Sequence, residues 1–184
     1  MEVKGTAIKT IPEFVKEKFP EEYSRWFNAL PDGSKTIFNE KISSSKWYPI
    51  KEALILPTRL IGEMFYEDIE KGAFELGIFS SESAIKGIYR MLVQISSPSF
   101  VVNRTSGIMS SYYRPCIMDV TKSSKKMAVL SIIDFPESDV VVDYRVLGWI
   151  KTTFEFSKFN SPKVTLLKSM GKGDFSTDYL VEWV

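Results

Sequence analysis

Histidine is absent from this chain of 184 residues, and cysteine occurs only once. Without an imidazole the chain cannot form a Ser–His–Asp triad or use histidine as a general base or a metal ligand. A single cysteine cannot form an internal disulfide or supply a zinc site of the common Cys/His type. Because no other motif supplies an acid, a base or a cofactor site, we expect no catalytic residues, no cofactor and no metal.

Two further absences concern membranes and nucleic acids. The sequence has no run of about 18 apolar residues, the length of a spanning helix, and residues 1–14 lack the basic start and apolar core of a signal peptide. We therefore expect no transmembrane segment and, with a single cysteine, a cytoplasmic location. The 24 basic residues against 23 acidic residues leave a net charge of +1, which argues against nucleic acid as the main partner.

Apolar and aromatic residues, in contrast, are plentiful. Apolar residues make up 44% of the chain and aromatic residues 14%, enough for a sizeable core, and the length suits a single domain over 1–184. Helical spacing dominates over about 1–114, whereas strand-like segments are concentrated in about 115–184. We expect an α+β fold in which an N-terminal helical layer packs on a C-terminal antiparallel sheet with the order ββαββ.

Turn residues and periodicity place the expected elements along the chain. In the first part we expect a strand at 3–8 and then a helix that Thr10 caps. A helix at 49–67 is expected to kink or split at Pro57, and a later helix is expected to break near Gly107. The remaining expected segments are helices at 21–30, 72–95 and 136–159 and strands at 116–123 and 125–135, closed by a hairpin.

The sequence Gly-Lys-Gly at 171–173, with Ser-Thr at 176–177, has the composition of a phosphate-binding loop. Such a loop lies between a strand and a helix, whose N-terminus binds the phosphate. Here Tyr179, Val181 and Trp183 alternate with other residues, which is typical of a strand. We therefore interpret the glycines as the turn of a β-hairpin.

Several short motifs stand along the chain: Gly5, KWYP at 46–49, GIYRM at 87–91, SPSF at 97–100, YYRP at 112–115 and Gly171. Together with the order of the elements, they resemble one known superfamily. It contains the haem-based nitric-oxide and oxygen sensors, the 4-vinyl reductase domains and the small subunits of the TRAPP vesicle-tethering complex. An uncharacterised bacterial family first defined in myxobacteria resembles the chain most, through Trp47-Tyr48-Pro49, Gly87, Tyr89, Arg90 and Pro98. The resemblance implies a haem-NO-binding/TRAPP-like fold.

The chain departs from this superfamily at the haem site. In the sensors a proximal histidine holds the haem iron, and a Tyr-x-Ser-x-Arg motif holds the propionates. This chain has no histidine, and none of its eight tyrosines begins that motif. Only Cys116, methionine and tyrosine remain as axial ligands, so we expect no haem. In the TRAPP subunits a cysteine carries an acyl chain in an internal tunnel, and Cys116 is the only residue here that an acyl chain could modify in this way.

A group of aromatic and arginine side chains forms the candidate ligand site. In this interpretation the aromatic rings line a pocket and an arginine binds the anionic head of a ligand. The alternative is that the rings belong to the core and the arginines pair with acids. The candidate residues are Trp47, Tyr48, Tyr89, Arg90, Tyr112, Tyr113 and Arg114.

Three functions remain open from the sequence. The first is a non-catalytic, haem-free ligand-binding or sensory domain that holds a hydrophobic or amphipathic small molecule and signals to a protein partner. The second is a scaffold or oligomerisation module without a ligand, as in the TRAPP subunits, which predicts an exposed apolar patch and a homodimer. The third is a reductase-like enzyme, for which no set of residues supplies the chemistry.

Overall fold

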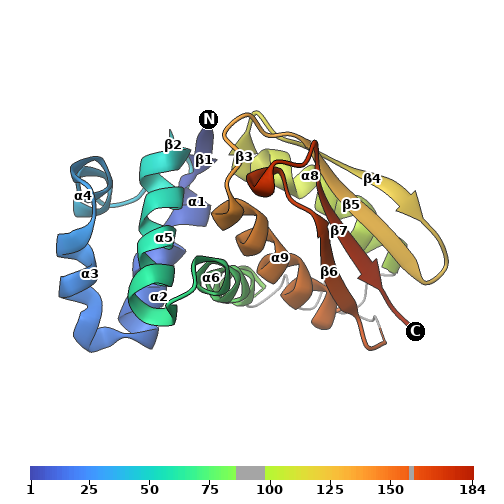
Figure 1. Cartoon of the computed structure of the whole chain (residues 1–184), viewed down its shortest axis with the longest axis horizontal. Coiled ribbons are helices and arrows are strands. Elements are labelled where there is room, and N and C mark those ends of the chain that lie inside the picture. The colour runs from blue at the N-terminus through green and yellow to red at the C-terminus, as the bar shows by residue number, and fades with distance from the viewer. Residues whose placement is uncertain (86–97, 158–159) are drawn as a thin grey trace.

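The structure of the chain, a computed structural model, describes residues 1–85, 98–157 and 160–184. Short helices form one side of the molecule and a sheet the other, with α6 (Ile69–Ala84) and α9 (Val140–Glu155) between them (Figure 1). The expected α+β class, with a helical part before a ββαββ part, is confirmed. Within the described ranges, no helix has both the length and the apolar character that crossing a bilayer requires.

The N-terminal helices are short because prolines interrupt them. Helix α2 (Thr10–Lys18) ends shortly before Pro20, and α3 (Tyr23–Ala29) ends shortly before Pro31. The indole of Trp26 on α3 is fully buried and donates to the carbonyl oxygen of Pro57 at 3.3 Å, which fastens α3 to the rest of the helical part. The other helical elements here are α1 (Gly5–Ile8), η1 (Pro20–Glu22), α4 (Asp32–Asn39), η2 (Lys51–Ile55), α5 (Leu56–Ile61), η3 (Gly62–Tyr66) and α8 (Pro98–Tyr112).

Two expectations at the start of the chain are wrong. The strand expected over 3–8 is only β1 (Glu2–Lys4), because the chain enters α1 at Gly5. Thr10 is not an N-cap, because α1 and α2 follow each other with one residue between them. Its hydroxyl donates back to the carbonyl oxygen of Ala7 at 2.8 Å, and its side chain is thereby held on the inner side of α2.

Two expected interruptions of helices have different outcomes. The prediction of a break near Gly107 is wrong, since α8 continues through this residue to Tyr112. A single exposed glycine lowers helix stability by only about 1 kcal/mol, which packing elsewhere on α8 outweighs. The interruption at Pro57 is present as a change of helix type: the π-helical η2 gives way to α5 at Leu56. A proline lacks the N–H that regular helix bonding needs.

The main sheet has four antiparallel strands in the order β4-β5-β7-β6. Thr177, Tyr179 and Val181 of β7 are buried and alternate with less buried residues, as in a strand with one face on the core. Helix α9 connects the two hairpins of the sheet and packs against it. The strands are β4 (Ile117–Ser123), β5 (Met127–Asp134), β6 (Lys163–Lys168) and β7 (Thr177–Glu182).

The predicted C-terminal hairpin is confirmed. After β6 the chain turns through η4 (Met170–Lys172) and Gly173, whose φ of 100° favours glycine. Strand β7 follows and pairs antiparallel with β6. Because a strand and not a helix follows the glycines, this segment is not a phosphate-binding loop.

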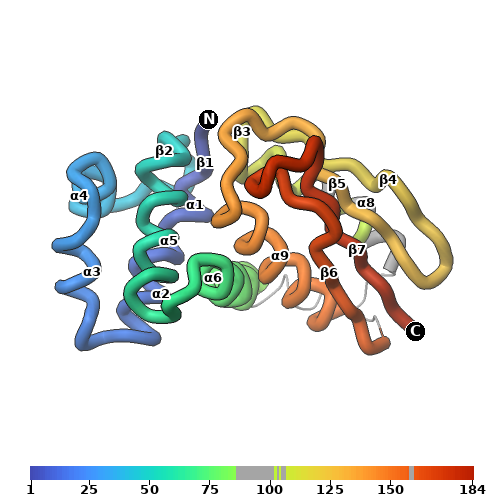
Figure 2. Tube along the Cα trace, viewed as in Figure 1, coloured from blue at the N-terminus to red at the C-terminus, as the bar shows by residue number. Residues whose placement is uncertain are grey.

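A second, small sheet joins distant parts of the chain. Its order is β2-β1-β3, with β2 at Trp47–Pro49 and β3 at Tyr113–Arg114. The tube in Figure 2 shows the start of the chain between these two segments. Strands of two or three residues are too short to show a period of two in the sequence, and neither β2 nor β3 was expected.

Two glycines allow α6 and α9 to pack closely (Figure 2). A Cβ atom on Gly77 would overlap the carbonyl oxygen of Arg145, and one on Gly148 would overlap the carbonyl oxygen of Phe74. One cluster of buried residues extends from the helical part into the sheet.

Candidate functional site

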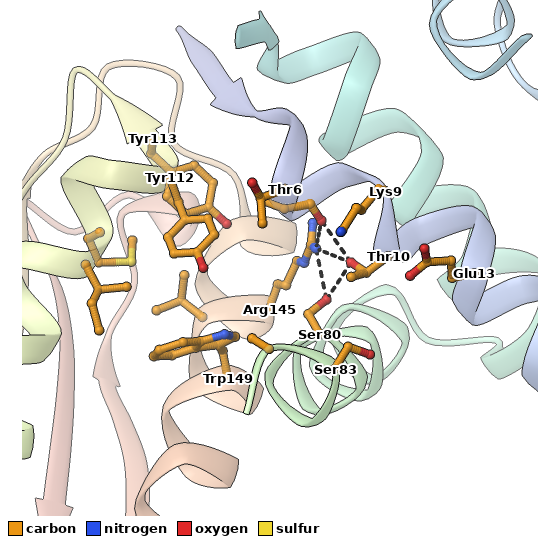
Figure 3. A pocket seen from close by; sticks show the side chains of 15 residues that line it. Thr6, Lys9, Thr10, Glu13, Ser80, Ser83, Tyr112, Tyr113, Arg145 and Trp149 are labelled. Atoms are coloured by element: carbon orange, nitrogen blue, oxygen red, sulfur yellow. Dashed lines mark hydrogen bonds between the residues drawn. The ribbon is translucent and has the colours of Figure 1, made fainter. Parts of the chain in front are cut away.

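A cavity of about 300 Å³ lies where α1, α2, α6, α8 and α9 meet (Figure 3). One part of its wall is apolar and comes from α8 and α9, including Ile108, Met109 and Val146. The opposite part is polar and comes from α1, α2 and α6. The remaining lining residues are Thr6, Ala7, Lys9, Thr10, Glu13, Ser80, Ser83, Ala84, Tyr112, Tyr113, Arg145 and Trp149.

Arg145 is the central polar group of this cavity. Its side chain leaves α9 toward α2 and α6 (Figure 3), and the residue is only 3% exposed. Nη2 donates to the carbonyl oxygen of Ala7 at 2.6 Å, to Ser80 Oγ at 3.0 Å and to Thr10 Oγ1 at 3.2 Å. The Thr10 and Ser80 hydroxyls are also hydrogen-bonded to each other at 2.9 Å. Nη1 is buried and has no hydrogen-bond partner in the described part of the chain.

The charge of Arg145 is not compensated by a carboxylate in the described ranges, where no acidic oxygen lies within 4.0 Å of its guanidinium. Burial lowers the pKa of Arg145, and the nearby Tyr113 opposes this effect. An arginine nevertheless stays protonated in proteins. The cavity wall therefore carries a buried positive charge whose three hydrogen-bond acceptors in the described ranges are all neutral.

Two tyrosines face Arg145 from the side opposite Thr10 (Figure 3). Tyr113 is 6% exposed, and burial raises the pKa of its hydroxyl despite the neighbouring charge of Arg145. Tyr112 comes from the end of α8 and is half-buried. The hydroxyl of Tyr113 is therefore a neutral group of the site at neutral pH.

The sequence-based candidates fall into three groups. Tyr112 and Tyr113 line the cavity, as interpreted. Tyr89 and Arg90 lie outside the described residues. Trp47, Tyr48 and Arg114 belong to the small sheet and are not among the residues that line the cavity.

Arg114 pairs with an acid, as in the alternative interpretation of the candidate residues. Its Nε donates to Glu2 Oε2 at 2.6 Å, and its guanidinium carbon lies 4.2 Å from the centre of the Trp47 ring. The Tyr48 hydroxyl accepts from the backbone N–H of Ser43 at 3.0 Å. The two contacts of Arg114 join β3 to β1 and β2 and give Arg114 a counter-charge.

Cys116, the candidate for acylation, is buried between β3 and β4 and is not among the residues that line the cavity. Burial raises the pKa of its thiol to about 12, and Asp134 adds to this effect. Thiolate is the reactive form of cysteine. The environment of Cys116 thus opposes the chemistry that forms a thioester, and its acylation stays a prediction.

Sequence reasoning missed the residues that make the cavity polar: Arg145, Thr10 and Ser80. A signal existed for Arg145, because it stands among Val142, Val146 and Trp149 on the apolar face of the predicted helix. A lone charge on such a face has to be buried or paired. For Thr10 and Ser80 no such signal exists, since small hydroxyl residues are common inside helices and at their ends.

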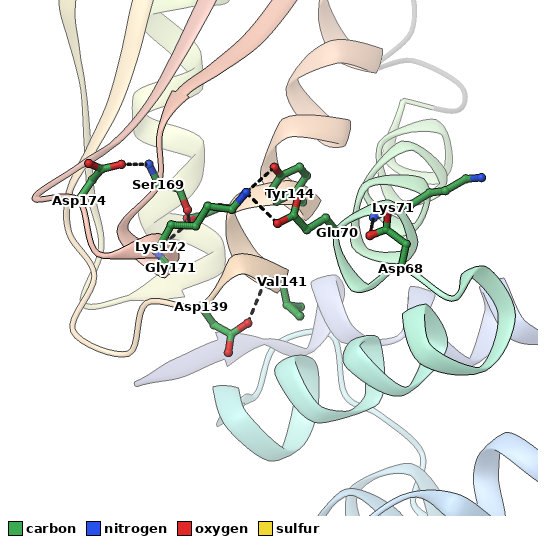
Figure 4. Close-up of polar contacts among 11 residues, drawn as sticks. Asp68, Glu70, Lys71, Asp139, Val141, Tyr144, Ser169, Gly171, Lys172 and Asp174 are labelled. Atoms are coloured by element: carbon green, nitrogen blue, oxygen red, sulfur yellow. Dashed lines mark hydrogen bonds and ion pairs between the residues drawn. The ribbon is translucent and has the colours of Figure 1, made fainter.

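A second polar network lies on the other side of α9 and holds the hairpin (Figure 4). Lys172 of η4 reaches α6 and α9, with its Nζ 2.8 Å from Glu70 Oε1 and 3.0 Å from the Tyr144 hydroxyl. Burial raises the pKa of Glu70, but its hydrogen bonds with Lys172 and Tyr144 outweigh this and lower it. Every charge in this network has a partner, so we assign it a structural role.

Comparisons with known proteins identify the fold. No family model matches the chain, and no curated protein matches its sequence.

Solved structures do match the fold of the chain. An H-NOX protein from S. oneidensis in the Fe(II)NO ligation state has a TM-score of 0.74 at 10% identity, covering 98% of this chain and 99% of that one. The Fe(II) unliganded H-NOX protein from K. algicida has a TM-score of 0.60 at 14% identity, covering 98% and 96%. A Cs H-NOX mutant with the unnatural amino acid 4-cyano-L-phenylalanine has a TM-score of 0.67 at 12% identity, covering 98% and 96%.

The chain therefore has the H-NOX fold, which confirms the part of the resemblance that concerns the haem-based sensors. Its relation to the vinyl reductase domains, the TRAPP subunits and the myxobacterial family stays a prediction. At these identities the likeness concerns the fold alone.

The residues of the cavity do not fit the haem that this fold implies. The chain has no histidine, and among the described lining residues only Met109, Tyr112 and Tyr113 carry atoms of a kind that ligates haem iron. At the roughly 30 Å³ that one water molecule occupies in the liquid, a cavity of about 300 Å³ admits on the order of ten non-hydrogen atoms. A haem has several times as many.

Proposed function

We propose that this chain is a haem-free, non-catalytic sensory domain that binds an amphipathic small molecule in the cavity and signals its presence to a protein partner. The observation that carries the proposal is the cavity itself, about 300 Å³ in volume and lined by Arg145, whose buried Nη1 has no hydrogen-bond partner among the described residues. This volume is at the lower end for small-molecule sites, and the mixture of an apolar wall with a few polar groups is typical of them.

The location of the cavity supports a sensory role. Its walls come from α1, α2 and α6 on one side and from α8 and α9 on the other. A ligand that prefers one packing of these helices over another shifts the population between the two. Helix α9 is also bonded to the terminal hairpin, because Asp143 accepts from the backbone N–H of Gly171 at 3.0 Å. A displacement of α9 is thus expected to move the hairpin, which offers a surface to a partner.

The polar groups of the cavity support binding rather than catalysis. Thr10 and Ser80 are hydrogen-bonded to Arg145 and to each other, and no general base lies next to either hydroxyl in the described part of the site. Activation of a hydroxyl as a nucleophile needs such a base. Glu13 is the single acid among the described lining residues, and it is exposed.

Native mass spectrometry of the purified protein tests this proposal. We expect an additional mass that is released when the protein is denatured. Ile108→Trp, which adds bulk to the cavity wall, is expected to abolish the additional mass. Ile133→Trp is the matched control, because Ile133 is 48% exposed on β5 and outside the cavity lining.

The polypeptide mass alone would overturn the proposal if it persists after incubation with a small-molecule extract of the expression host. A homodimer whose mass is twice that of the polypeptide, with no additional mass, would instead favour the scaffold module.

A further inference from the structure

Arg145 is a buried cation that the chain itself does not neutralise. In the described ranges its three acceptors are one carbonyl oxygen and two hydroxyls. Glu13, the acid that lines the same cavity, is not within ion-pair distance of it. Asp143, two residues earlier on α9, is occupied by Ser169, Gly171 and Thr177.

The residues outside the described ranges cannot supply the missing charge either. The segments 86–97 and 158–159 contain no aspartate and no glutamate. The counter-charge of Arg145 therefore has to come from outside the chain or be absent. A buried charge without a partner is strongly unfavourable, so a ligand that brings a negative charge gains more here than at an exposed arginine.

We infer that the ligand of the cavity is an organic carboxylate, whose head group binds the Arg145 guanidinium through the unpaired Nη1 and whose apolar part lies against Ile108, Met109 and Trp149. This inference rests on the proposed function and specifies the ligand class of the same site. A charged N–H donor of a guanidinium makes a short, strong hydrogen bond with a carboxylate oxygen. The hydroxyls of Thr10 and Ser80 hold Nη2 and so set the orientation of Nη1.

The size and lining of the cavity narrow the class further. Its volume of about 300 Å³ admits on the order of ten non-hydrogen atoms. Because Ile108, Met109, Val146 and Trp149 offer no charge, the part of the ligand distant from its head is apolar. Medium-chain fatty acids and small aromatic acids meet both conditions.

Isothermal titration calorimetry at pH 7 with octanoate and octanamide tests the inference. These probes have the same number of non-hydrogen atoms, about ten, and differ mainly in charge. We expect octanoate to bind at least about tenfold more tightly than octanamide, because only octanoate pairs with the guanidinium. Arg145→Gln is expected to remove this preference and leave octanamide binding in place. Arg145→Lys, which keeps the charge, retains a preference for octanoate.

Arg25→Gln is the matched control, because it removes one arginine whose side chain is 71% exposed and bonded to Glu22 outside the cavity. It is expected to leave both affinities unchanged.

Equal affinities of the wild-type protein for the two probes would overturn the inference and leave the proposed function intact. Binding of neither probe would contradict the inference, and the mass spectrum would then decide the proposed function separately. The comparison of the two probes on the wild-type protein needs no variant, so a misfolded Arg145→Gln protein does not affect it.

Discussion

The two sides of helix α9 each carry a buried charge, and the two charges differ in their hydrogen-bond partners. Asp143 and Arg145 are each 3% exposed and stand two positions apart, yet they do not pair. On the sheet side, Asp143 accepts hydrogen bonds from Ser169 at 2.5 Å, from Gly171 at 3.0 Å and from Thr177 at 2.8 Å. On the cavity side, Arg145 has neutral acceptors and one nitrogen without a partner among the residues that the structure describes.

This difference separates a structural charge from one that is open to a ligand. The partners of Asp143 belong to the hairpin, so its carboxylate fixes β6 and β7 on α9. Arg145, in contrast, lines a cavity, and its buried Nη1 has no hydrogen-bond partner in the described part of the chain. A buried group without its full set of partners is an indication of function when a cavity lies beside it.

The largest loss of stability is expected from a substitution that displaces α9 from α6. Gly148→Ala would place a Cβ atom onto the carbonyl oxygen of Phe74, and we expect it to lower the free energy of unfolding by about 3 kcal/mol. Urea denaturation measures this change. Gly107→Ala is the matched control, because nothing lies within 4 Å of the added atom, and it is expected to raise stability by up to about 1 kcal/mol. Equal effects of the two variants would contradict the close packing of α6 and α9.

Removal of the charge on the sheet side is expected to have the next largest effect. Asp143→Ala leaves the Gly171 N–H and the hydroxyls of Ser169 and Thr177 without their acceptor. We expect a loss of about 2 kcal/mol in the free energy of unfolding. Asp119→Ala, at an exposed position of β4, is the control and is expected to be almost neutral. A stable Asp143→Ala protein would show that the hairpin does not depend on this carboxylate.

The pH dependence of the same variant sharpens the test. Burial raises the pKa of Asp143 above its usual 3.8, even though three hydrogen bonds oppose this. A raised pKa means that the contribution of Asp143 to stability is fully present below pH 3.8 and declines as the pH rises through the folded-state pKa. The difference in unfolding free energy between wild type and Asp143→Ala is therefore expected to be wider at pH 4 than at pH 7. A difference that narrows toward pH 4 would contradict the direction of this shift.

Removal of the charge on the cavity side is expected to raise the stability of the protein, whereas removal of the Asp143 charge lowers it. Arg145→Met replaces an uncompensated buried cation by an apolar side chain of similar length. We expect the ligand-free protein to gain about 1 kcal/mol of stability, while the preference for an anionic ligand is lost. Thermal unfolding of protein that has been freed of ligand measures the gain. A clear loss of stability would indicate that Arg145 is a structural residue like Asp143.

The smallest effect is expected at the surface. Lys172→Gln removes the ion pair with Glu70 and the hydrogen bond to Tyr144, and the Lys172 side chain is 47% exposed. Exposed pairs contribute about 0–1 kcal/mol, so urea denaturation should detect little change. The remaining difference from wild type should vanish in about 1 M salt, where charges are screened within about 3 Å. A large, salt-resistant loss would show that this network, and not Asp143 alone, holds the hairpin.

The sequence by itself was sufficient for the features that local patterns encode. Val142, Val146 and Trp149 recur at helical intervals and predicted α9. The glycines at 171 and 173 predicted the hairpin, and Gly173 adopts the left-handed backbone that the turn needs. The composition alone excluded a histidine-ligated haem. These conclusions depend on residues that are neighbours in the chain.

The tertiary structure alone decided which residues form the site. Arg145 contacts Ala7, Thr10 and Ser80 across 138, 135 and 65 positions of sequence. The sequence pointed to Arg114 as an anion binder and not to Arg145, but β1 brings Glu2 to Arg114 across 112 positions and neutralises it. No local pattern records which of two arginines meets a carboxylate. That choice depends on how helices and strands pack, because charge compensation is a property of neighbours in space.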